Sequence, residues 1–409
     1  MKRSRTIRKG EKMGRKWCTG RCLTIVAVVV MLSTTQAGIV RAQSKPAVTE
    51  WEIPLLSVLT GPVAFAGMPA VWGAEYAAKE INNAGGIRGV PVKIVRYDTA
   101  FNEAKAVSAM GRVVDSSLVV LGPIDGPGGE AAGPVAAEAK VPFIGQLPSP
   151  AIRERCKPWG VAYMPDSIDG SLLAVPEWIK LNPGIKSVAV FYIPSDPAQV
   201  DDFKAVSAAL TKAGAKVLGP IEVQTGQLDM GPVAVKAMNL KPDGYFCILR
   251  SDEYVKVATE LYNRGMTDGK RICAVFAANS PNLLQVGKDR LNGTYIWDTF
   301  DLSYPGARWK ALFDAYKAEH SGQLPIGTAA FFYDAVYAVK AVIEANNLTG
   351  DKSKLAEERT KISNALFNSR ELEGVQGKYR YVNGKKIAPY VLLQIRDNQL
   401  VRVSALIPR

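Results

Sequence analysis

The stretch from Thr60 to Gly145 decides the fold, and it carries these motifs in chain order: Thr60-Gly61-Pro62, Gly73-Ala74-Glu75, Glu80-Ile81-Asn82, Gly85-Gly86-Ile87 and Val119-Val120-Leu121-Gly122-Pro123. Around these motifs, short apolar runs alternate with helical patterns. Trp51 to Leu59 predicts a strand, Pro69 to Asn83 a helix, and Val90 to Tyr97 a second strand. Continuous Val, Ile and Leu runs bounded by Gly and Pro are typical of parallel strands covered on both faces. The stretch therefore predicts a doubly wound α/β sheet.

The same alternation restarts after Pro165 and continues to Asp298. Beyond that point two long helical stretches, 306–320 and 329–346, precede short strands near the C-terminus. No Pro-rich or Ser-rich tether separates the halves, and a chain of this length is more than one core usually serves. We therefore predict an α/β protein with two doubly wound, Rossmann-like lobes joined by strand-like crossings.

The order of these motifs resembles the leucine/isoleucine/valine-binding family of type I periplasmic binding proteins. The resemblance implies a three-strand hinge, one lobe formed by 51–164 plus 301–385, and a second formed by 165–300 plus 386–409. It also implies a monomeric receptor without a cofactor. Such a receptor captures a small solute and delivers it to an ABC transporter permease in the inner membrane. The alternative is a sensor that passes solute occupancy to a membrane-bound regulator.

The N-terminal segment has the features of an export signal. Lys2 to Arg21 is basic, Cys22 to Met31 is apolar and uncharged, and Val40-Arg41-Ala42 places small residues where a signal peptidase cleaves. The apolar run is shorter than the ~20 residues that a bilayer core requires. We expect 1–42 to be a signal peptide, with cleavage after Ala42 or after Ala37, and the mature protein to be periplasmic.

The charge of the whole chain is misleading until this segment is removed. The formal net charge is +13, but residues 1–42 hold ten of the 51 Lys and Arg and one of the 38 acidic residues, which leaves +4 for the remainder. A strongly basic protein would suggest nucleic acid or an anionic membrane as partner. The excess lies mostly in the segment that is cut off, so nucleic-acid binding is not expected.

The residue inventory gives little support for catalysis. His320 is the only histidine, and it lies at the end of a predicted helix beside Glu319 and Ser321. General bases and metal sites usually draw on histidine. Because no clustered Cys and His, nucleophile elbow or P-loop is present, we expect neither an enzyme nor a metal site.

One motif favours an alternative function, that of a dinucleotide-dependent enzyme. Gly126-Pro127-Gly128-Gly129-Glu130-Ala131 fits the dinucleotide fingerprint and opens a helix after a strand. A ribose-binding acid should then end the next strand, but that strand continues into Gln146 and Leu147. A dinucleotide-dependent enzyme is therefore the minor alternative, behind the use of this helix N-terminus to bind a small ligand.

The same loop departs from the family pattern. The family reads Gly-Pro-x-Ser-Ser-Gly here and holds the ligand carboxylate, whereas Asp125 and Gly126 stand in place of the serines and Pro127 removes a donor. An ionised Asp125 about 4 Å from a ligand carboxylate would cost ~4 kcal/mol at an effective dielectric of 20. Asp125 must turn away or be paired, or the ligand must present a neutral or cationic group. Equally, Asp125 caps the following helix.

Two further loops of the first lobe resemble ligand loops of the family. Phe65 and Ala66 stand where an aromatic ring often lines the cleft, although Phe65 could equally pack under its loop. Leu147, Pro148 and Ser149 align with a stretch that contacts the same end of the ligand. Ser149 keeps a hydroxyl for this contact, or it starts a turn before a proline.

The second lobe departs further from the family. Amino-acid binders place an acid for the ligand ammonium where this chain has Phe276, which suits an apolar or aromatic ligand, or a cation over its ring. Arg250 ends a strand at the edge that faces the cleft, so it is a candidate for an anionic ligand. Its alternative is a salt bridge to Asp252 or Glu253. An aromatic or aliphatic acid on Arg250, or an amide or amine on Asp125, are the ligand classes left open.

The mature chain keeps three cysteines, Cys156, Cys247 and Cys273. Cys247 and Cys273 end two apolar runs and could face each other from neighbouring strands. The preferred interpretation is three buried thiols that pack as small apolar groups.

Overall fold

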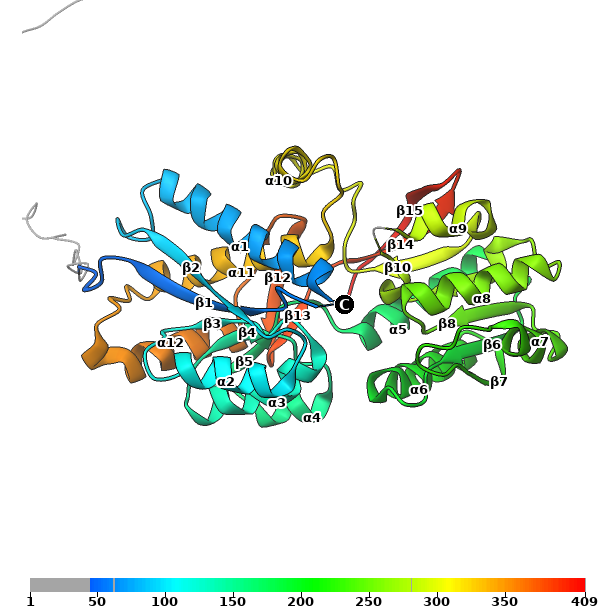
Figure 1. Cartoon of the computed structure of the whole chain (residues 1–409), viewed down its shortest axis with the longest axis horizontal. Helices are drawn as coiled ribbons and strands as arrows, with labels where there is room; N and C mark the ends of the chain where they lie inside the picture. The colour runs from blue at the N-terminus through cyan, green and yellow to red at the C-terminus, as the bar shows by residue number, and fades with distance from the viewer. Residues whose placement is uncertain (1–44, 62, 281, 409) are drawn as a thin grey trace, which may run out of the picture. The chain divides into compact units, whose positions relative to one another are not determined.

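The computed structural model describes residues 45–408 except 62 and 281. The predicted signal peptide, 1–42, lies outside the described residues, as does Pro62 of the first motif. The elements run in the following order (Figure 1): β1 (Trp51–Ser57), α1 (Ala64–Asn83), β2 (Val92–Asp98), α2 (Glu103–Val113), β3 (Val120–Leu121), α3 (Gly126–Glu138), β4 (Phe143–Gly145), α4 (Pro150–Arg155), β5 (Gly160–Ala162), α5 (Ser167–Leu181), β6 (Ser187–Tyr192), α6 (Pro197–Lys212), β7 (Lys216–Glu222), α7 (Gly231–Asn239), β8 (Gly244–Cys247), α8 (Ser251–Asn263), β9 (Ile272–Ala274), α9 (Leu283–Gly287), β10 (Tyr295–Asp298), α10 (Ala307–Glu319), α11 (Gly327–Ala345), α12 (Leu355–Phe367), β11 (Leu372–Gly374), β12 (Gly377–Val382), β13 (Lys385–Ile387), β14 (Tyr390–Arg396) and β15 (Gln399–Leu406).

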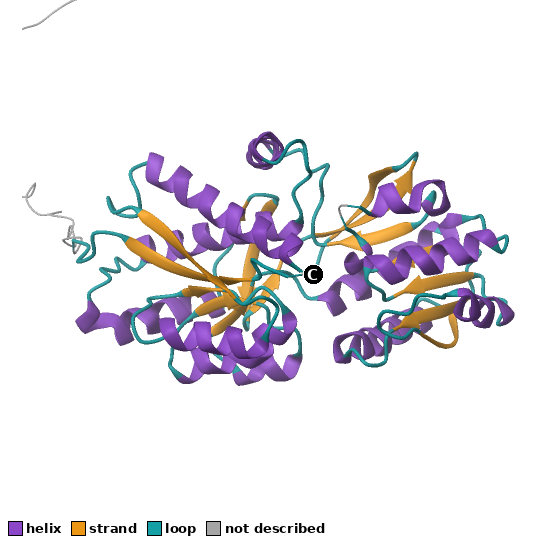
Figure 2. Ribbon diagram, viewed as in Figure 1, coloured by secondary structure: helices purple, strands orange, loops and turns teal. Residues whose placement is uncertain are grey.

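The first large sheet has the strand order β2-β1-β3-β4-β5, and its neighbouring strands run parallel. Trp51, Ile53 and Leu55 of β1 pack with α1, α11 and α12, whereas Leu56 packs with α2 and α3. Successive side chains of a strand point to opposite faces, so the apolar run of β1 supplies two cores at once. Helices accordingly cover both faces of this sheet (Figure 2).

The second large sheet has the order β15-β14-β10-β9-β8-β6-β7. The five strands from β10 to β7 are parallel, and β14 and β15 join them as an antiparallel edge. One face packs with α7 and α8, and the other with α5 and α6. The predicted class, two doubly wound α/β lobes, is confirmed.

A small third sheet has the order β11-β12-β13, and its strand β13 lies against β5 of the first large sheet. The chain passes three times between the elements around the first large sheet and those around the second: between β5 and α5, between β10 and α10, and between β13 and β14. A bridge between Pro165 and Lys386 joins the first passage to the third. The Tyr390 hydroxyl also donates to the Asp166 carbonyl oxygen at 2.9 Å. We call these segments the three passages. The residue limits of the lobes given above stay a prediction.

Several local expectations differ from the structure. Helix α1 begins at Ala64 rather than Pro69, and Pro69 lies inside the helix. In α3, by contrast, Pro127 stands in the first turn, where a proline loses no hydrogen bond because the N–H there has no partner within the helix. The short elements α4, β5 and β10 were not predicted at all.

The cysteines do not face each other. Cys247 of β8 pairs with Ala274 of β9, and Cys273 pairs with Phe246. An offset of one residue turns the two side chains to opposite faces of the sheet, where they enter separate cores. All three cysteines in the described part of the chain are free and buried, as the preferred interpretation had it.

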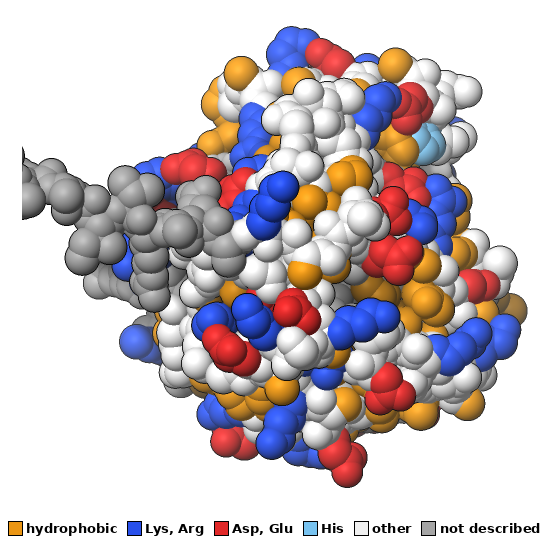
Figure 3. All heavy atoms as spheres, turned by 90° about the vertical axis from the view of Figure 1, so that its left-hand side faces the viewer, with side chains coloured by type: hydrophobic (Ala, Val, Ile, Leu, Met, Phe, Trp, Pro, Cys, Tyr) orange, Lys and Arg blue, Asp and Glu red, His pale blue; other side chains and the backbone are white. Residues whose placement is uncertain are grey.

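The described surface carries charges of both signs. On the face shown in Figure 3, Lys and Arg side chains are interspersed with Asp and Glu side chains. Within residues 45–408 as described, no helix is long and apolar enough to cross a membrane.

The close packing of α1 against α11 gives a prediction for two glycines. A Cβ added at Gly73 would lie 2.0 Å from the backbone oxygen of Ala329, whereas one added at Gly111 of α2 would meet nothing within 4 Å. We predict that Gly73→Ala lowers the free energy of unfolding by about 1–3 kcal/mol through overpacking. The matched change Gly111→Ala should raise it by about 0.5–1 kcal/mol, because alanine is the better helix former. Urea denaturation followed by circular dichroism measures both, and equal effects of the two changes would contradict the packing argument.

Candidate functional site

A cavity of about 1010 Å³ lies at the carboxyl ends of the parallel strands of both large sheets. The segments that follow β1 to β9 all contribute to its wall. Lys385 and Lys386 of β13, just before the third passage, also line it. Loops at the carboxyl ends of parallel strands are where doubly wound sheets bind ligands. We call this cavity the cleft.

Apolar side chains line much of the cleft. Phe65 near the start of α1 is 59% exposed, and Phe101 follows β2. Phe276 follows β9 and packs against the ring of Trp297, with centroids 5.3 Å apart. Leu147 completes this set from the first lobe. A ligand with an apolar or aromatic body therefore finds rings on both sides.

Two aspartates of the cleft wall each bind two different partners, one through each carboxylate oxygen. In each, one oxygen caps a helix: Asp166 accepts from the Ile168 N–H at the start of α5, and Asp196 accepts from the Ala198 N–H at the start of α6. The other oxygen holds an arginine. Side-chain caps of this kind satisfy backbone N–H groups that have no partner within the helix.

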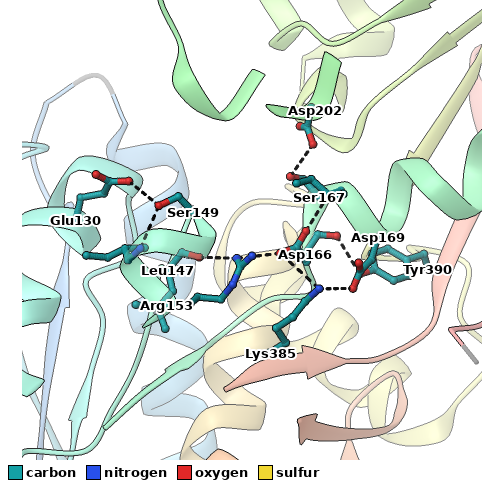
Figure 4. A network of polar contacts seen from close by, with 12 residues as sticks. Glu130, Leu147, Ser149, Arg153, Asp166, Ser167, Asp169, Asp202, Lys385 and Tyr390 are labelled. Atoms are coloured by element: carbon teal, nitrogen blue, oxygen red, sulfur yellow. Dashed lines mark hydrogen bonds and ion pairs between the residues drawn. The ribbon is translucent and has the colours of Figure 1, made fainter. Parts of the chain in front are cut away.

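The arginine held by Asp166 belongs to a network at the first passage (Figure 4). Arg153 of α4 lies 2.9 Å from Asp166 and donates to the Leu147 carbonyl oxygen at 3.1 Å. Lys385 of β13 lies 2.8 Å from Asp169 and 3.9 Å from Asp166. The Arg153 side chain is only 14% exposed, so its charge is largely committed to this network.

Asp196 holds Arg250, the second-lobe residue predicted to face the cleft. The Arg250 Nη2 donates to Asp196 Oδ2 at 2.6 Å, so the partner is not Asp252 or Glu253 as the alternative interpretation had it. The Arg250 side chain is 53% exposed. In the described part of the chain its Nε and Nη1 donate to nothing, which leaves the guanidinium able to bind an oxyanion.

Asp125 does not line the cleft. It is buried, and its Oδ1 accepts from the Gly128 N–H at 2.7 Å as the cap of α3. Its Oδ2 has no hydrogen-bond partner among the described groups, and burial raises the pKa of this carboxyl. The helix-cap interpretation of Asp125 fits this geometry, and contact with a ligand does not. The carboxylate also occupies the helix N-terminus that a dinucleotide pyrophosphate would need.

The structure places most of the other predicted ligand residues on the cleft wall: Phe65, Gly126, Pro127, Leu147, Pro148, Ser149, Arg250 and Phe276. Ala66 is not among the lining residues, and its carbonyl oxygen accepts from the Thr328 hydroxyl of α11. Ser149 is engaged on both sides, because it caps α4 through the Ile152 N–H and its hydroxyl donates to Glu130 at 3.3 Å.

His320 is not among the residues that line the cleft. It is the cap residue after α10, as its predicted place at a helix end implies, and its ring stacks on Tyr316 with centroids 4.0 Å apart. The side chain is partly buried, and the ring also lies edge-on to Trp72 of α1. In the described ranges no group of His, Cys, Asp or Glu is arranged to hold a metal ion.

Asp202 of α6 is a cleft residue that the sequence did not single out. Its carboxylate accepts from the Ser167 hydroxyl at 3.1 Å (Figure 4). Burial raises its pKa to about 7, and the nearby charges of Asp166 and Asp196 act in the same direction.

Other residues missed at the cleft are Arg153, Asp166, Asp196 and Lys385. Asp166 directly precedes α5 and Asp196 directly precedes α6, and an aspartate at a helix start is a cap signature that could have been found. The predicted helices missed it, because they began a few residues later. Arg153 left no such signal, because α4 is six residues long and was not predicted.

Comparison with known proteins gives three kinds of match. A family model described as periplasmic binding protein matches residues 50–399. The Leu/Ile/Val-binding protein of Escherichia coli strain K12 is 36% identical over 67 residues, which is 16% of this chain and 18% of that relative. The chain thus matches only about a fifth of the length of this relative at the sequence level.

Solved structures cover far more of the chain. A leucine-binding protein from Thermotoga maritima aligns with a TM-score of 0.73 and 21% identity, covering 87% of this chain and 99% of that one. A solute-binding protein of an ABC transporter from R. palustris, in complex with 4-hydroxybenzoate, aligns with a TM-score of 0.74 and 17% identity, covering 88% and 97%. At these identities the similarity establishes the fold.

The raised pKa of Asp202 predicts a pH dependence of stability. A carboxyl whose pKa rises from about 4 in the unfolded chain to about 7 in the folded chain binds its proton more tightly when folded. Its contribution to stability is therefore present below about pH 4 and is lost as the pH rises toward 7. We predict that Asp202→Asn gains at least ~1.4 kcal/mol relative to wild type between pH 5 and pH 8, the value of one pKa unit. Denaturation at a series of pH values measures this, and a constant difference between the two proteins would contradict it.

Proposed function

Because the chain belongs to the periplasmic binding protein family, we propose that it captures a small carboxylate with an apolar, aromatic-sized body and delivers it to an ABC transporter permease. The family and the structural neighbours are solute-binding proteins rather than enzymes. The proposal includes a periplasmic location, a monomeric state and a permease in the inner membrane as partner. No cofactor is part of it.

The observation that carries the proposal is that Arg250 and Phe276 both line the cleft. Arg250 keeps most of its donors free and is more than half exposed. Phe276 stands where the resemblance expects an acid for an α-ammonium group. A guanidinium with free donors and a ring on the wall of one cleft suit a carboxylate on an apolar body better than a zwitterionic amino acid.

None of the aspartates in or near the cleft is a comparable partner for an amine, although the exposed carboxylates of Glu103 and Glu130 also line it. Asp166 and Asp196 are each occupied by a helix N-terminus and an arginine, and Asp202 carries a pKa of about 7. Asp125 lies off the wall as a helix cap. The amide or amine option, which depended on Asp125, therefore loses its support.

The cleft is larger than a benzoate-sized ligand requires. About 1010 Å³ is at the upper end of the range for sites that enclose drug-sized molecules. A benzoate-sized ligand would need the walls to approach each other before it touched both. Because the wall draws on both sheets, ligand contacts from the two sides would favour a closed form over an open one.

The structural neighbours supply one further line of support. The R. palustris protein whose fold matches is described in complex with 4-hydroxybenzoate, an aromatic carboxylate. Its identity to this chain is 17%, so the ligand argument rests on Arg250 and Phe276 and the neighbour agrees with it.

Calorimetric titration of 4-hydroxybenzoate and of leucine tests the proposal. We predict saturable binding of 4-hydroxybenzoate that Arg250→Gln weakens by about 1.5–3 kcal/mol, the value of a hydrogen bond to a charged group, which is roughly 10- to 150-fold. Arg264→Gln, at the other end of α8, is the matched control and should leave the affinity unchanged, because Arg264 pairs with Glu260 and does not line the cleft.

Two results would contradict this proposal. One is tight binding of leucine with none of any aromatic carboxylate. The other is an equal loss of 4-hydroxybenzoate affinity in Arg250→Gln and Arg264→Gln, which would show that the cleft arginine has no special role.

A further inference from the structure

A second cavity, of about 520 Å³, lies beside the second and third passages. Its wall combines α11 and the β11–β12 hairpin with β14 and β15 of the second large sheet. Lys386 is the one residue that lines both this cavity and the cleft. The second cavity is therefore a separate space, built from other residues than the proposed ligand site.

The ammonium of Lys386 faces the second cavity. The side chain is only 3% exposed, and Nζ lies 4.2 Å from the ring centroid of Tyr379 and 5.0 Å from that of Phe331. Its distance to Asp334 Oδ2 is 3.8 Å, which is longer than a hydrogen bond. These three neighbours line the second cavity and not the cleft.

A second cation enters the same cavity from β15. Arg402 Nη1 lies 3.3 Å from Asp301 Oδ2, and its side chain is partly exposed. Lys378 and Glu373, which also line the cavity, form a third pair at 3.7 Å. Each basic group thus has a carboxylate partner, and the three pairs leave the cavity without a net charge.

The carboxylates of the Lys386 and Arg402 pairs nevertheless make more hydrogen bonds than the basic groups do. Asp301 also accepts from the backbone N–H and the hydroxyl of Ser303, and Asp334 accepts from the Val375 N–H. By contrast, the ammonium of Lys386 has only its long 3.8 Å contact with Asp334 within the described residues, and Arg402 donates through Nη1 alone. A buried ammonium normally finds hydrogen-bond acceptors, because leaving its donors unmade is costly. The groups in this cavity that lack hydrogen-bond partners are therefore donors, namely N–H groups of these two basic side chains.

We infer that the second cavity binds a small oxyanion, a carboxylate or phosphate group, between Lys386 and Arg402. The oxyanion would accept hydrogen bonds from those N–H groups of Lys386 and Arg402 that do not donate to Asp334 or Asp301. Tyr304 and Tyr390 also line this cavity, so a short organic body attached to the charged group would lie against their side chains.

The position of the cavity has a consequence for the cleft. An occupant would touch α11 on one side of the passages and β15 on the other, so it would respond to any movement of the passages. If the lobes close as proposed above, the two sites change each other's affinity by the same factor. This coupling rests on the proposed function, but oxyanion binding itself does not.

Inorganic phosphate is the probe for the test, titrated calorimetrically into the protein at constant ionic strength with no cleft ligand present. We expect saturable binding that Arg402→Gln weakens at least tenfold. The control is Arg380→Gln, an exposed arginine on β12 outside the cavity, which should leave binding unchanged.

A second variant guards against misfolding. Lys386→Met alone would leave Asp334 buried beside an apolar chain, so the double change Lys386→Met with Asp334→Asn removes both charges together. It should keep a cooperative thermal transition and lose phosphate binding. The inference is overturned if phosphate does not bind saturably, if Arg402→Gln and the double variant bind it as wild type does, or if Arg250→Gln abolishes the signal, because the anion would then sit in the cleft. Loss of 4-hydroxybenzoate binding plays no part in this test, so the two proposals fail separately.

Discussion

The cleft depends on two aspartates that each serve a helix and an arginine. Asp166 caps α5 and holds Arg153, and Asp196 caps α6 and holds Arg250. A helix N-terminus favours an anion, and an arginine at the surface of a cavity needs one, so a single carboxylate stabilises both. The difference in burial then separates their roles: Arg153 is enclosed by its network, whereas Arg250 keeps free donors.

Parallel strands bring these groups together. Residues that follow β5, β6, β8 and β9 are far apart in sequence, but the carboxyl ends of parallel strands meet at one edge of each sheet. The rings of Phe65 and Phe276 reach the same cleft from different sheets for this reason. A cleft that is lined by these rings and by an arginine with free donors suits an apolar carboxylate, which is the chemistry of the proposed function.

The sequence was most informative where burial alone determines structure. Strands covered on both faces read as apolar runs, so the two doubly wound lobes were predictable. Position after a strand also identified Arg250 and Phe276. The pairing of Arg250 with Asp196 was not predictable, because it joins residues 54 positions apart whose side-chain directions depend on the finished fold. The two interpretations of Asp125 stayed open for a similar reason: a cap and a ligand contact require the same residue type, and only the side-chain rotamer separates them.

In the proposed function, the two lobes close on a small carboxylate held by Arg250. Small-angle X-ray scattering, with and without saturating 4-hydroxybenzoate, measures this closure. We predict a smaller radius of gyration in the presence of the ligand, and no such change in Arg250→Gln at the same concentration. A radius that stays constant in wild type while calorimetry shows the site to be filled would contradict it.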